Sequence, residues 1–223
     1  MMKKKKIKGI ILDLCGGTGS WSRPYKNAGY DVHTITLPDY DIKKTETFGM
    51  LIMFPHSTIR DKSIVVRTDE IHGILAAPPC TMFSFARTKA KTPRDIKEGM
   101  ECVRACLEII WYCQSVVQDT NKKTLPLKWW ALENPYHGLL KNIIGRPAFT
   151  FDPWEFGDGY QKRTALWGSF TDPVKRPIPT LGVKFDYLKS KDIHPEVFGK
   201  FDRQTRRSIT PAGFANAFFK ANQ

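Results

Sequence analysis

The sequence lacks a hydrophobic run long enough to cross a bilayer, which takes about 20 residues. The lysine run at residues 3–6 is followed only by a short apolar stretch at residues 7–14 that itself contains charges, so we expect neither a membrane span nor a secretory signal. Acidic residues are also few: 22 Asp and Glu stand against 35 Lys and Arg, which leaves a net charge of +13. Because a surface this positive attracts polyanions, nucleic acid is the expected partner.

Cysteine is sparse and is not arranged as in disulfide frameworks. The five cysteines form no CxxC pair, and their odd number argues against such a framework, so a reducing compartment, the cytoplasm, is expected. Cys102, Cys106 and Cys113 are spaced by four and seven residues, which places them on one helical face and predicts core positions. The five histidines have no ligand-like spacing to these cysteines, so no structural metal is expected.

Short apolar runs alternate with helical patterns along the chain. This predicts an α/β fold of one domain over residues 1–223, with a mostly parallel sheet covered by helices on both faces. The expected strands lie at residues 7–14, 30–37, 72–77 and 127–135, and a C-terminal antiparallel hairpin at 149–157 and 163–170. Helices are expected at residues 20–27, over about 20 residues after Arg94, and at 210–222. Residues 48–68 indicate a hairpin or an excursion from the sheet, and residues 171–208 an extended surface loop.

A glycine-rich turn, DLCGGTG at residues 13–19, lies between the first expected strand and helix. Glycines allow the backbone to approach a ligand, and amides at a helix start can meet a polar or anionic group. The spacing is not G-x-G-x-x-G, and no Lys-Ser or Lys-Thr follows as in a P-loop. The pattern therefore favours S-adenosylmethionine over ATP or a dinucleotide, with a turn that binds no ligand as the alternative.

Two reactive groups directly follow apolar strands, at the edge where open α/β sheets place ligands. Cys80 ends Pro78-Pro79-Cys80, and Glu133 begins Glu133-Asn134-Pro135. The basic loop at residues 87–94 would favour a thiolate if it folds over Cys80. The alternatives are a buried thiol and a capping or salt-bridging glutamate. Further on, Gln161-Lys162-Arg163 offers donors for a phosphate or a base edge, the alternative being an exposed basic strand end.

The order DLCGGTG, PPCTMFS, ENP, QKR and TPAGFANAFF resembles the DNA cytosine C5-methyltransferase family across nearly the whole chain, and most resembles the short forms encoded by bacteriophages. The resemblance implies a Rossmann-like class I methyltransferase fold that uses S-adenosylmethionine. It also implies duplex or single-stranded DNA as the substrate, the cytoplasm of a bacterial host as the location, and no obligate protein partner.

The resemblance also assigns roles to residues. It makes Cys80 the nucleophile, Glu133 the group that binds the target ring, and Arg163 a third catalytic residue. The implied cofactor-binding residues are Asp13, Leu14, Gly16, Gly17, Gly19, Trp21, Thr36, Leu37, Asp41, Ile42, Pro78 and Asn216. The implied substrate-binding residues are Ser84, Arg87, Lys89, Arg94, Asn134, Gln161 and Lys162.

This chain departs from the family pattern at several positions. Thr36-Leu37-Pro38 replaces the acid that normally ends the second strand, and Ala165 stands where a second arginine belongs, so a contact to the cytosine O2 is not carried over. Only about 40 residues separate Gln161-Lys162-Arg163 from the last helix, too few for a large target-recognition domain, so sequence selectivity is expected to be short or loose. Two alternatives remain: a tRNA-type cytosine C5-methyltransferase, and a catalytically inactive DNA-binding relative, which the intact Cys80 and Glu133 disfavour.

Overall fold

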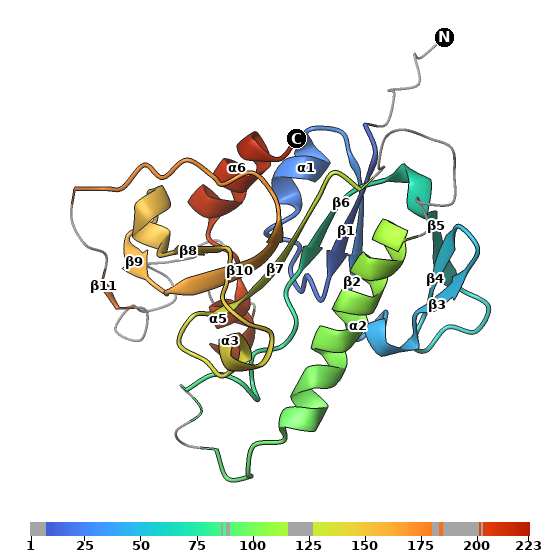
Figure 1. Ribbon diagram of the computed structural model, residues 1–223, viewed down its shortest axis with the longest axis horizontal. Coiled ribbons are helices and arrows are strands. Elements are labelled where there is room, and N and C mark those ends of the chain that lie inside the picture. Colours follow the sequence, from blue (N-terminus) through green and yellow to red (C-terminus); the bar gives the residue numbers. More distant parts are fainter. Residues whose placement is uncertain are drawn as a thin grey trace.

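The computed structural model describes residues 8–85, 87, 90–115, 127–179, 183–184, 201 and 203–223. Over these residues the chain forms a six-stranded sheet in the order β2-β1-β6-β7-β10-β8, with a separate three-stranded sheet beside it (Figure 1). The strands of the main sheet are β1 (Ile10–Leu14), β2 (Asp31–Ile35), β6 (Ile71–Ala76), β7 (Trp129–Pro135), β8 (Phe149–Phe151) and β10 (Thr164–Ser169). The helices are α1 (Arg23–Asn27), α2 (Ile96–Ser115), α3 (Leu140–Ile143), α5 (Arg203–Ser208) and α6 (Ala212–Ala221).

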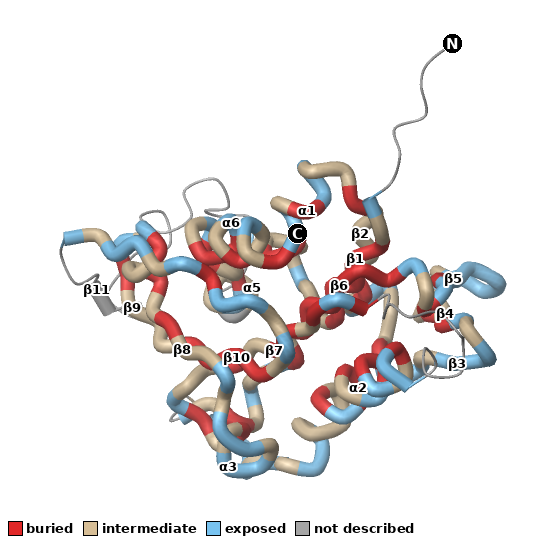
Figure 2. The backbone as a smooth tube through the Cα atoms, turned by 45° about the horizontal axis from the view of Figure 1, so that its top comes forward, coloured by how far each residue is buried: buried red, intermediate tan, exposed pale blue. Residues whose placement is uncertain are grey.

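The main sheet is mixed. β2, β1, β6 and β7 run parallel, whereas β10 runs antiparallel to both of its neighbours, β7 and β8. Helices α1 and α6 lie over one face and α2 over the other (Figure 2). The predicted α/β class, the mostly parallel sheet and its coverage by helices on both faces are therefore confirmed.

Alternation along the strands divides the interior into two cores. Leu12 and Leu14 of β1 pack on the α2 side, in a core that also contains Cys106 and Cys113, so the prediction that these two cysteines are core residues is confirmed. Ile11 of β1 points to the other face and joins an aromatic core beneath α1 and α6. The large rings of that core are Trp21, Tyr25, Trp129, Phe151, Phe214 and Phe218.

The excursion predicted at residues 48–68 is confirmed. β3 (Glu46–Phe48), β4 (Leu51–Pro55) and β5 (Ser63–Arg67) form an antiparallel sheet of their own. Its Ile52, Phe54 and Val66 side chains are buried and join the core on the α2 side. This small sheet therefore extends the α2-side core without adding a strand to the main sheet.

The C-terminal hairpin is confirmed only in part. β8 and β10 pair antiparallel, but the strand predicted to run to residue 157 ends at Phe151 and is followed by the 3-10 helix η4 (Pro153–Phe156). Pro153 cannot donate to a strand ladder, and a capping box between Asp152 and Glu155 fixes the turn instead.

The prediction of an extended loop over residues 171–208 is wrong at its C-terminal end, because Arg203–Ser208 forms helix α5. The letters RQTRRS contain no apolar residue, so this helix leaves no hydrophobic period in the sequence. β11 (Val183–Lys184) also pairs with β9 (Tyr160–Gln161), whereas residues 185–200 lie outside the described part of the chain.

The remaining helix predictions are confirmed with small shifts. α2 has 20 residues and α6 follows Pro211, whereas α1 begins at Arg23, three residues later than the pattern indicates, with Pro24 in its first turn. In the described part of the chain, no helix combines the length and the apolar character that a membrane crossing requires.

Candidate active site at the carboxyl edge of the sheet

The glycine turn that follows β1 packs directly against the buried carboxylate of Asp13. Asp13 is fully buried, and the Ser22 hydroxyl donates a hydrogen bond to its Oδ2 at 2.5 Å, whereas its Oδ1 has no partner among the described residues. Burial raises the pKa of Asp13 to about 6, although the Ser22 hydrogen bond opposes this rise. A Cβ atom at Gly16 would lie 2.3 Å from the Asp13 carboxyl carbon, so the turn must carry glycine there.

A cavity of about 810 Å³ opens beside this turn, a size that suits a nucleoside-sized ligand. Gly17 borders it with φ +54, and no atom lies within 4 Å of the place where its Cβ would be. Predicted cofactor residues Leu37, which follows β2, and Asn216, on α6, also line it. Helices α1 and α5 complete the wall, and the polar side chains that line the cavity include Thr18, Ser20, Arg23, Asn27, Thr205 and Ser208.

The other predicted cofactor residues do not line this cavity. Gly16 and Gly19 shape the turn, and Asp41 caps the 3-10 helix η1 (Ile42–Lys44) by accepting the Lys43 amide at 3.1 Å. The side chains of Leu14, Trp21 and Ile42 are buried in the two cores. Asp13, Thr36 and Pro78 are likewise not among the lining residues.

The two motif segments at the ends of β6 and β7 are tied to one another. Asn134 is buried, and its side-chain amide donates to the Pro78 carbonyl at 3.0 Å. Because β6 and β7 are parallel neighbours, this bond places the Cys80 segment beside the end of β7, where Glu133 lies. Asn134, predicted to bind substrate, therefore acts here as a link between two loops.

The turn that follows Cys80 is fixed by its own backbone and by one arginine. The Cys80 carbonyl accepts the amides of Phe83 and Ser84 at 2.9 and 2.8 Å. Arg94 donates to the carbonyls of Met82 and Ser84 at 2.9 and 2.8 Å. Arg94 thus holds the turn that follows Cys80, a role that the prediction of a substrate contact did not include.

Arg87 is also occupied by backbone. It donates to the carbonyls of Thr92 and Pro93, both at 2.9 Å, and so closes the basic loop on itself. Lys91 is exposed, whereas Lys89 lies outside the described residues. Arg94 therefore joins the end of this loop to the turn after Cys80, whereas the charges that lower the pKa of the Cys80 thiol come from Lys162 and Arg207, outside the loop.

Neighbouring charges act on Cys80 and on Glu133 at the sheet edge. Burial raises the pKa of the Cys80 thiol, the charge of Glu133 raises it further, and the charges of Lys162 and Arg207 lower it. Burial also raises the pKa of Glu133, against the opposing charge of Lys162. These groups come from the segment after β6, from β7, from the β9–β10 connection and from α5.

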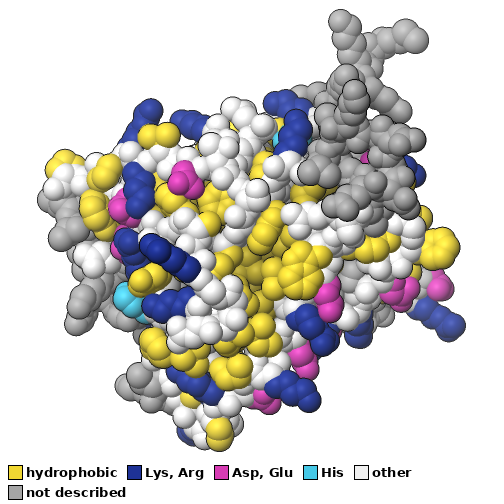
Figure 3. Space-filling model, in the orientation of Figure 1, with side chains coloured by type: hydrophobic (Ala, Val, Ile, Leu, Met, Phe, Trp, Pro, Cys, Tyr) yellow, Lys and Arg dark blue, Asp and Glu magenta, His cyan; other side chains and the backbone are white. Residues whose placement is uncertain are grey.

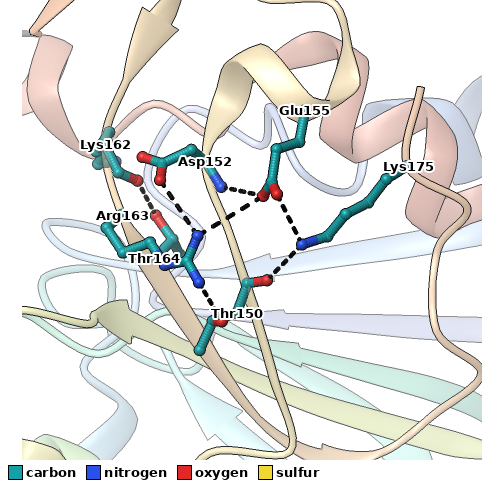
Figure 4. A network of polar contacts seen from close by, with 7 residues as sticks. All are labelled: Thr150, Asp152, Glu155, Lys162, Arg163, Thr164 and Lys175. Atoms are coloured by element: carbon teal, nitrogen blue, oxygen red, sulfur yellow. Dashed lines mark hydrogen bonds and ion pairs between the residues drawn. The ribbon is translucent and has the colours of Figure 1, made fainter. Parts of the chain in front are cut away.

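Arg163 is engaged elsewhere, in a polar network on β8 and η4 (Figure 4). Its guanidinium donates to Asp152 Oδ2 at 3.3 Å and to Thr150 Oγ1 at 2.8 Å. Lys175 joins the same network through Glu155 at 2.9 Å. The charge of Lys162 thus acts on both Cys80 and Glu133, whereas Arg163 stabilises the β8–η4 segment.

Sequence reasoning missed Arg207 entirely, because its helix has no apolar pattern. Of the other predicted substrate residues, Ser84 forms a bridge to Gly138, and Gln161 lies in β9 and pairs with Lys184 of β11. Over the described residues, no group of three or more His, Cys, Asp or Glu side chains could hold a metal ion.

No protein-family model matches the chain, and no curated protein is significantly similar to it. The function is therefore inferred from the groups at this edge of the sheet.

Proposed function

We propose that the protein is a DNA cytosine C5-methyltransferase with a Rossmann-like class I methyltransferase fold. The observation that carries the proposal is the position of Cys80 and Glu133 at the carboxyl ends of the adjacent parallel strands β6 and β7, whose end segments are joined by the hydrogen bond from Asn134 to Pro78, at the same edge of the sheet as the glycine turn after β1. The sheet is consistent with this proposal, because its parallel strands are followed by an antiparallel β8–β10 pair, which the sequence pattern predicts.

The cavity fits S-adenosylmethionine in size and in chemistry. Its wall offers hydroxyl groups of Thr18, Ser20 and Ser208 for a ribose, and the Leu37 side chain for an apolar ring. Gly17 leaves open space where any larger side chain would obstruct a ligand. When bound, S-adenosylmethionine supplies a methyl group on a positively charged sulfur, which is electrophilic enough for transfer to carbon.

Cys80 provides the nucleophile that cytosine needs, because C5 by itself is too weakly nucleophilic to accept a methyl group. Addition of the thiolate to C6 forms an S–C6 bond and moves electron density to C5 and N3. After methylation, loss of the C5 proton to a base and cleavage of the S–C6 bond restore the aromatic ring and release the thiolate.

Glu133 is placed to stabilise the ring while this charge develops. Burial raises the pKa of Glu133, so its carboxylate takes up a proton more readily than a solvated one and can pass that proton to N3 as charge develops on the ring. The second carboxyl oxygen can accept from the exocyclic amino group. The target base must be flipped out of a duplex to reach these groups, at a cost of a few kcal/mol, unless the strand is already single.

Charge supports a nucleic-acid substrate. The net charge is +13, and Lys and Arg side chains gather over the β8–β10 half of the main sheet on the face drawn in Figure 3. Contacts to phosphate of this kind are not specific for sequence, which agrees with the absence of room for a large recognition domain.

A trapping experiment tests the proposal. The protein is incubated with S-adenosylmethionine and oligonucleotides that carry 5-fluorocytosine, because fluorine at C5 cannot leave as a proton and the S–C6 bond then persists. We expect a covalent complex with DNA that survives denaturing electrophoresis and maps to Cys80 by mass spectrometry. Trapping on matching RNA instead of DNA would move the assignment to a tRNA-type enzyme, and no trapping on either would overturn it.

A further inference from the structure

The cavity beside the glycine turn is lined by one charged side chain among the described residues, that of Arg23. The other lining residues are glycine, apolar residues, or residues with hydroxyl or amide side chains, and none of those described is Asp or Glu. A negatively charged group of a ligand is therefore attracted to this wall, and no carboxylate of the wall opposes that attraction.

Arg23 follows directly on the glycine turn. It is the first residue of α1, and its amide donates to the Gly19 carbonyl at 3.0 Å. Asn27, four residues later, also lines the cavity, and residues four apart lie on the same face of a helix. One face of α1 thus presents a guanidinium and a carboxamide to the cavity.

The guanidinium of Arg23 differs from those of Arg94 and Arg163, which donate to a backbone carbonyl and to a carboxylate. Among the described residues, the Arg23 guanidinium has no hydrogen-bond acceptor and no ion-pair partner. Arg23 is exposed, so its N–H donors are hydrated and can be transferred to a planar anion. Arg23 is therefore the arginine at this edge of the sheet that the fold itself does not use.

The wall formed by α1 is joined to the wall formed by α6 and the segment before it. Helices α1 and α6 lie over the same face of the main sheet (Figure 2), and the Tyr25 hydroxyl donates to the Asn222 carbonyl at 3.0 Å. The Thr210 amide donates to Ser20 Oγ, also at 3.0 Å. Because these bonds join the two walls, the chain itself sets the width of the cavity, and a ligand there meets Arg23 at a wall that is already in place.

We infer that Arg23 binds the carboxylate of the amino-acid part of S-adenosylmethionine. The inference rests on the proposed function for the identity of the cofactor and adds a residue to which the family resemblance assigns no role. The carboxylate is the one negatively charged group of that ligand, and a guanidinium matches a carboxylate with two parallel hydrogen bonds. Arg23 thus determines which end of the cofactor lies against α1.

Calorimetry with two ligands that differ only in the carboxylate isolates this contact. S-adenosylhomocysteine has the carboxylate, decarboxylated S-adenosylhomocysteine lacks it, and neither carries a sulfonium charge. We expect the wild type to bind S-adenosylhomocysteine about tenfold more tightly than the decarboxylated ligand. Arg23→Met should weaken the binding of S-adenosylhomocysteine about tenfold. It should bind the decarboxylated ligand at least as tightly as the wild type does, because the ligand's ammonium group is no longer repelled.

Two further variants separate this contact from a general effect of charge. Arg23→Lys should retain part of the preference for the carboxylate, because it keeps the charge but loses the planar pair of donors. Lys26→Met removes a charge from the same helix at a residue that does not line the cavity, so it should leave both affinities unchanged. Circular dichroism verifies that each variant folds. Wild-type affinities in a folded Arg23→Met variant overturn the inference, and so does an equal loss for both ligands, which is the result of a merely structural role.

A phosphate would suit the same guanidinium, so AMP is titrated as a third ligand. Binding of AMP that depends on Arg23, in place of S-adenosylhomocysteine, would overturn the inference, as would a wild type that binds neither adenosyl ligand. The titrations contain no nucleic acid, so their result does not depend on methyl transfer. A carboxylate preference that requires Arg23, without covalent trapping on 5-fluorocytosine, would retain the inference and reject the cytosine methyltransferase. Trapping together with an undiminished preference in Arg23→Met would retain the methyltransferase and reject the inference.

Discussion

The loops that follow β1 and β6 occupy equivalent places at one edge of the sheet, and each carries a cysteine, yet their surroundings differ. A hydrogen bond with Cys102 lowers the pKa of Cys15, but a hydrogen bond with Cys106, burial and the charge of Asp13 together raise it. Burial and Glu133 also raise the pKa of Cys80, but Lys162 and Arg207 lower it. Topology therefore places both thiols at the carboxyl edge of the sheet, and the neighbouring charges favour Cys80 over Cys15 as the proposed nucleophile.

The largest effect on covalent trapping should come from replacing each of the two cysteines separately. Cys80→Ser should abolish covalent trapping on 5-fluorocytosine DNA, because a hydroxyl is far less nucleophilic than a thiolate near neutral pH. Cys15→Ser should trap at close to the wild-type rate, since burial and the charge of Asp13 raise the pKa of the Cys15 thiol and disfavour its thiolate. Denaturing electrophoresis of radiolabelled DNA measures both variants, and loss of trapping in Cys15→Ser alone would reverse the assignment of the nucleophile.

Glu133→Gln separates the two roles that the carboxyl group combines. We expect trapping to slow by about 10² to 10³, because the proton donor to N3 is lost. Iodoacetamide should meanwhile alkylate Cys80 at a lower pH than in the wild type, because a repelling charge is gone. Affinity for S-adenosylhomocysteine, measured by calorimetry, should stay nearly constant; a marked loss of that affinity would mean that Glu133 serves the cofactor.

Asp13 makes the loop after β1 sensitive to pH. Its pKa is about 6 in the folded chain against the ordinary value of 3.8, so the folded state retains a proton that the unfolded state loses between these values. Stability should therefore fall as pH rises from about 4 to 6.5, by about 3 kcal/mol from this group, and then stay level. Urea unfolding across this range should show the fall in the wild type, whereas Asp13→Asn should lack this contribution; equal pH profiles for both proteins would contradict the assignment.

Asn134→Ala should have the smallest of these effects on stability. It removes the bond to the Pro78 carbonyl from a buried position, which typically costs about 1 to 3 kcal/mol. The urea midpoint should fall without a change of slope. Asn142→Ala, on the short helix α3, serves as a control. An equal loss of unfolding free energy in that variant would show that the hydrogen bond between the two loops contributes no more than an ordinary surface asparagine.

Much of the framework follows from pattern. The apolar period predicts α2 almost to the residue, and the rule that ligands meet the carboxyl edge of a parallel sheet predicts that Cys80 and Glu133 share a site. Which of two consecutive basic residues turns toward that site depends on strand register and on partners distant in sequence. Lys162 was therefore predicted only as a substrate contact, and Arg163, rather than Lys162, as the catalytic residue.

Packing explains the other differences. Trp21 and Ile42 lie within motif segments that the resemblance assigns to the cofactor, but the aromatic core and the α2-side core take up their side chains. Asn134 and Arg94 bond to backbone carbonyls, partners that a sequence pattern does not reveal. α5 carries only polar side chains, and its position depends on tertiary contacts such as the one between Thr210 and Ser20.

The second half of α5 serves two places at once. Thr205 and Ser208 border the cavity, and Arg207 acts on the Cys80 sulfur. A ligand in the cavity that fixes the position of this helix also fixes the position of the Arg207 charge that acts on the Cys80 thiol. Ligand binding in the cavity and protonation of Cys80 are then thermodynamically linked. Such linkage is reciprocal. If the bound ligand changes the pKa of Cys80, then ionisation of Cys80 changes the affinity for the ligand by the same free energy.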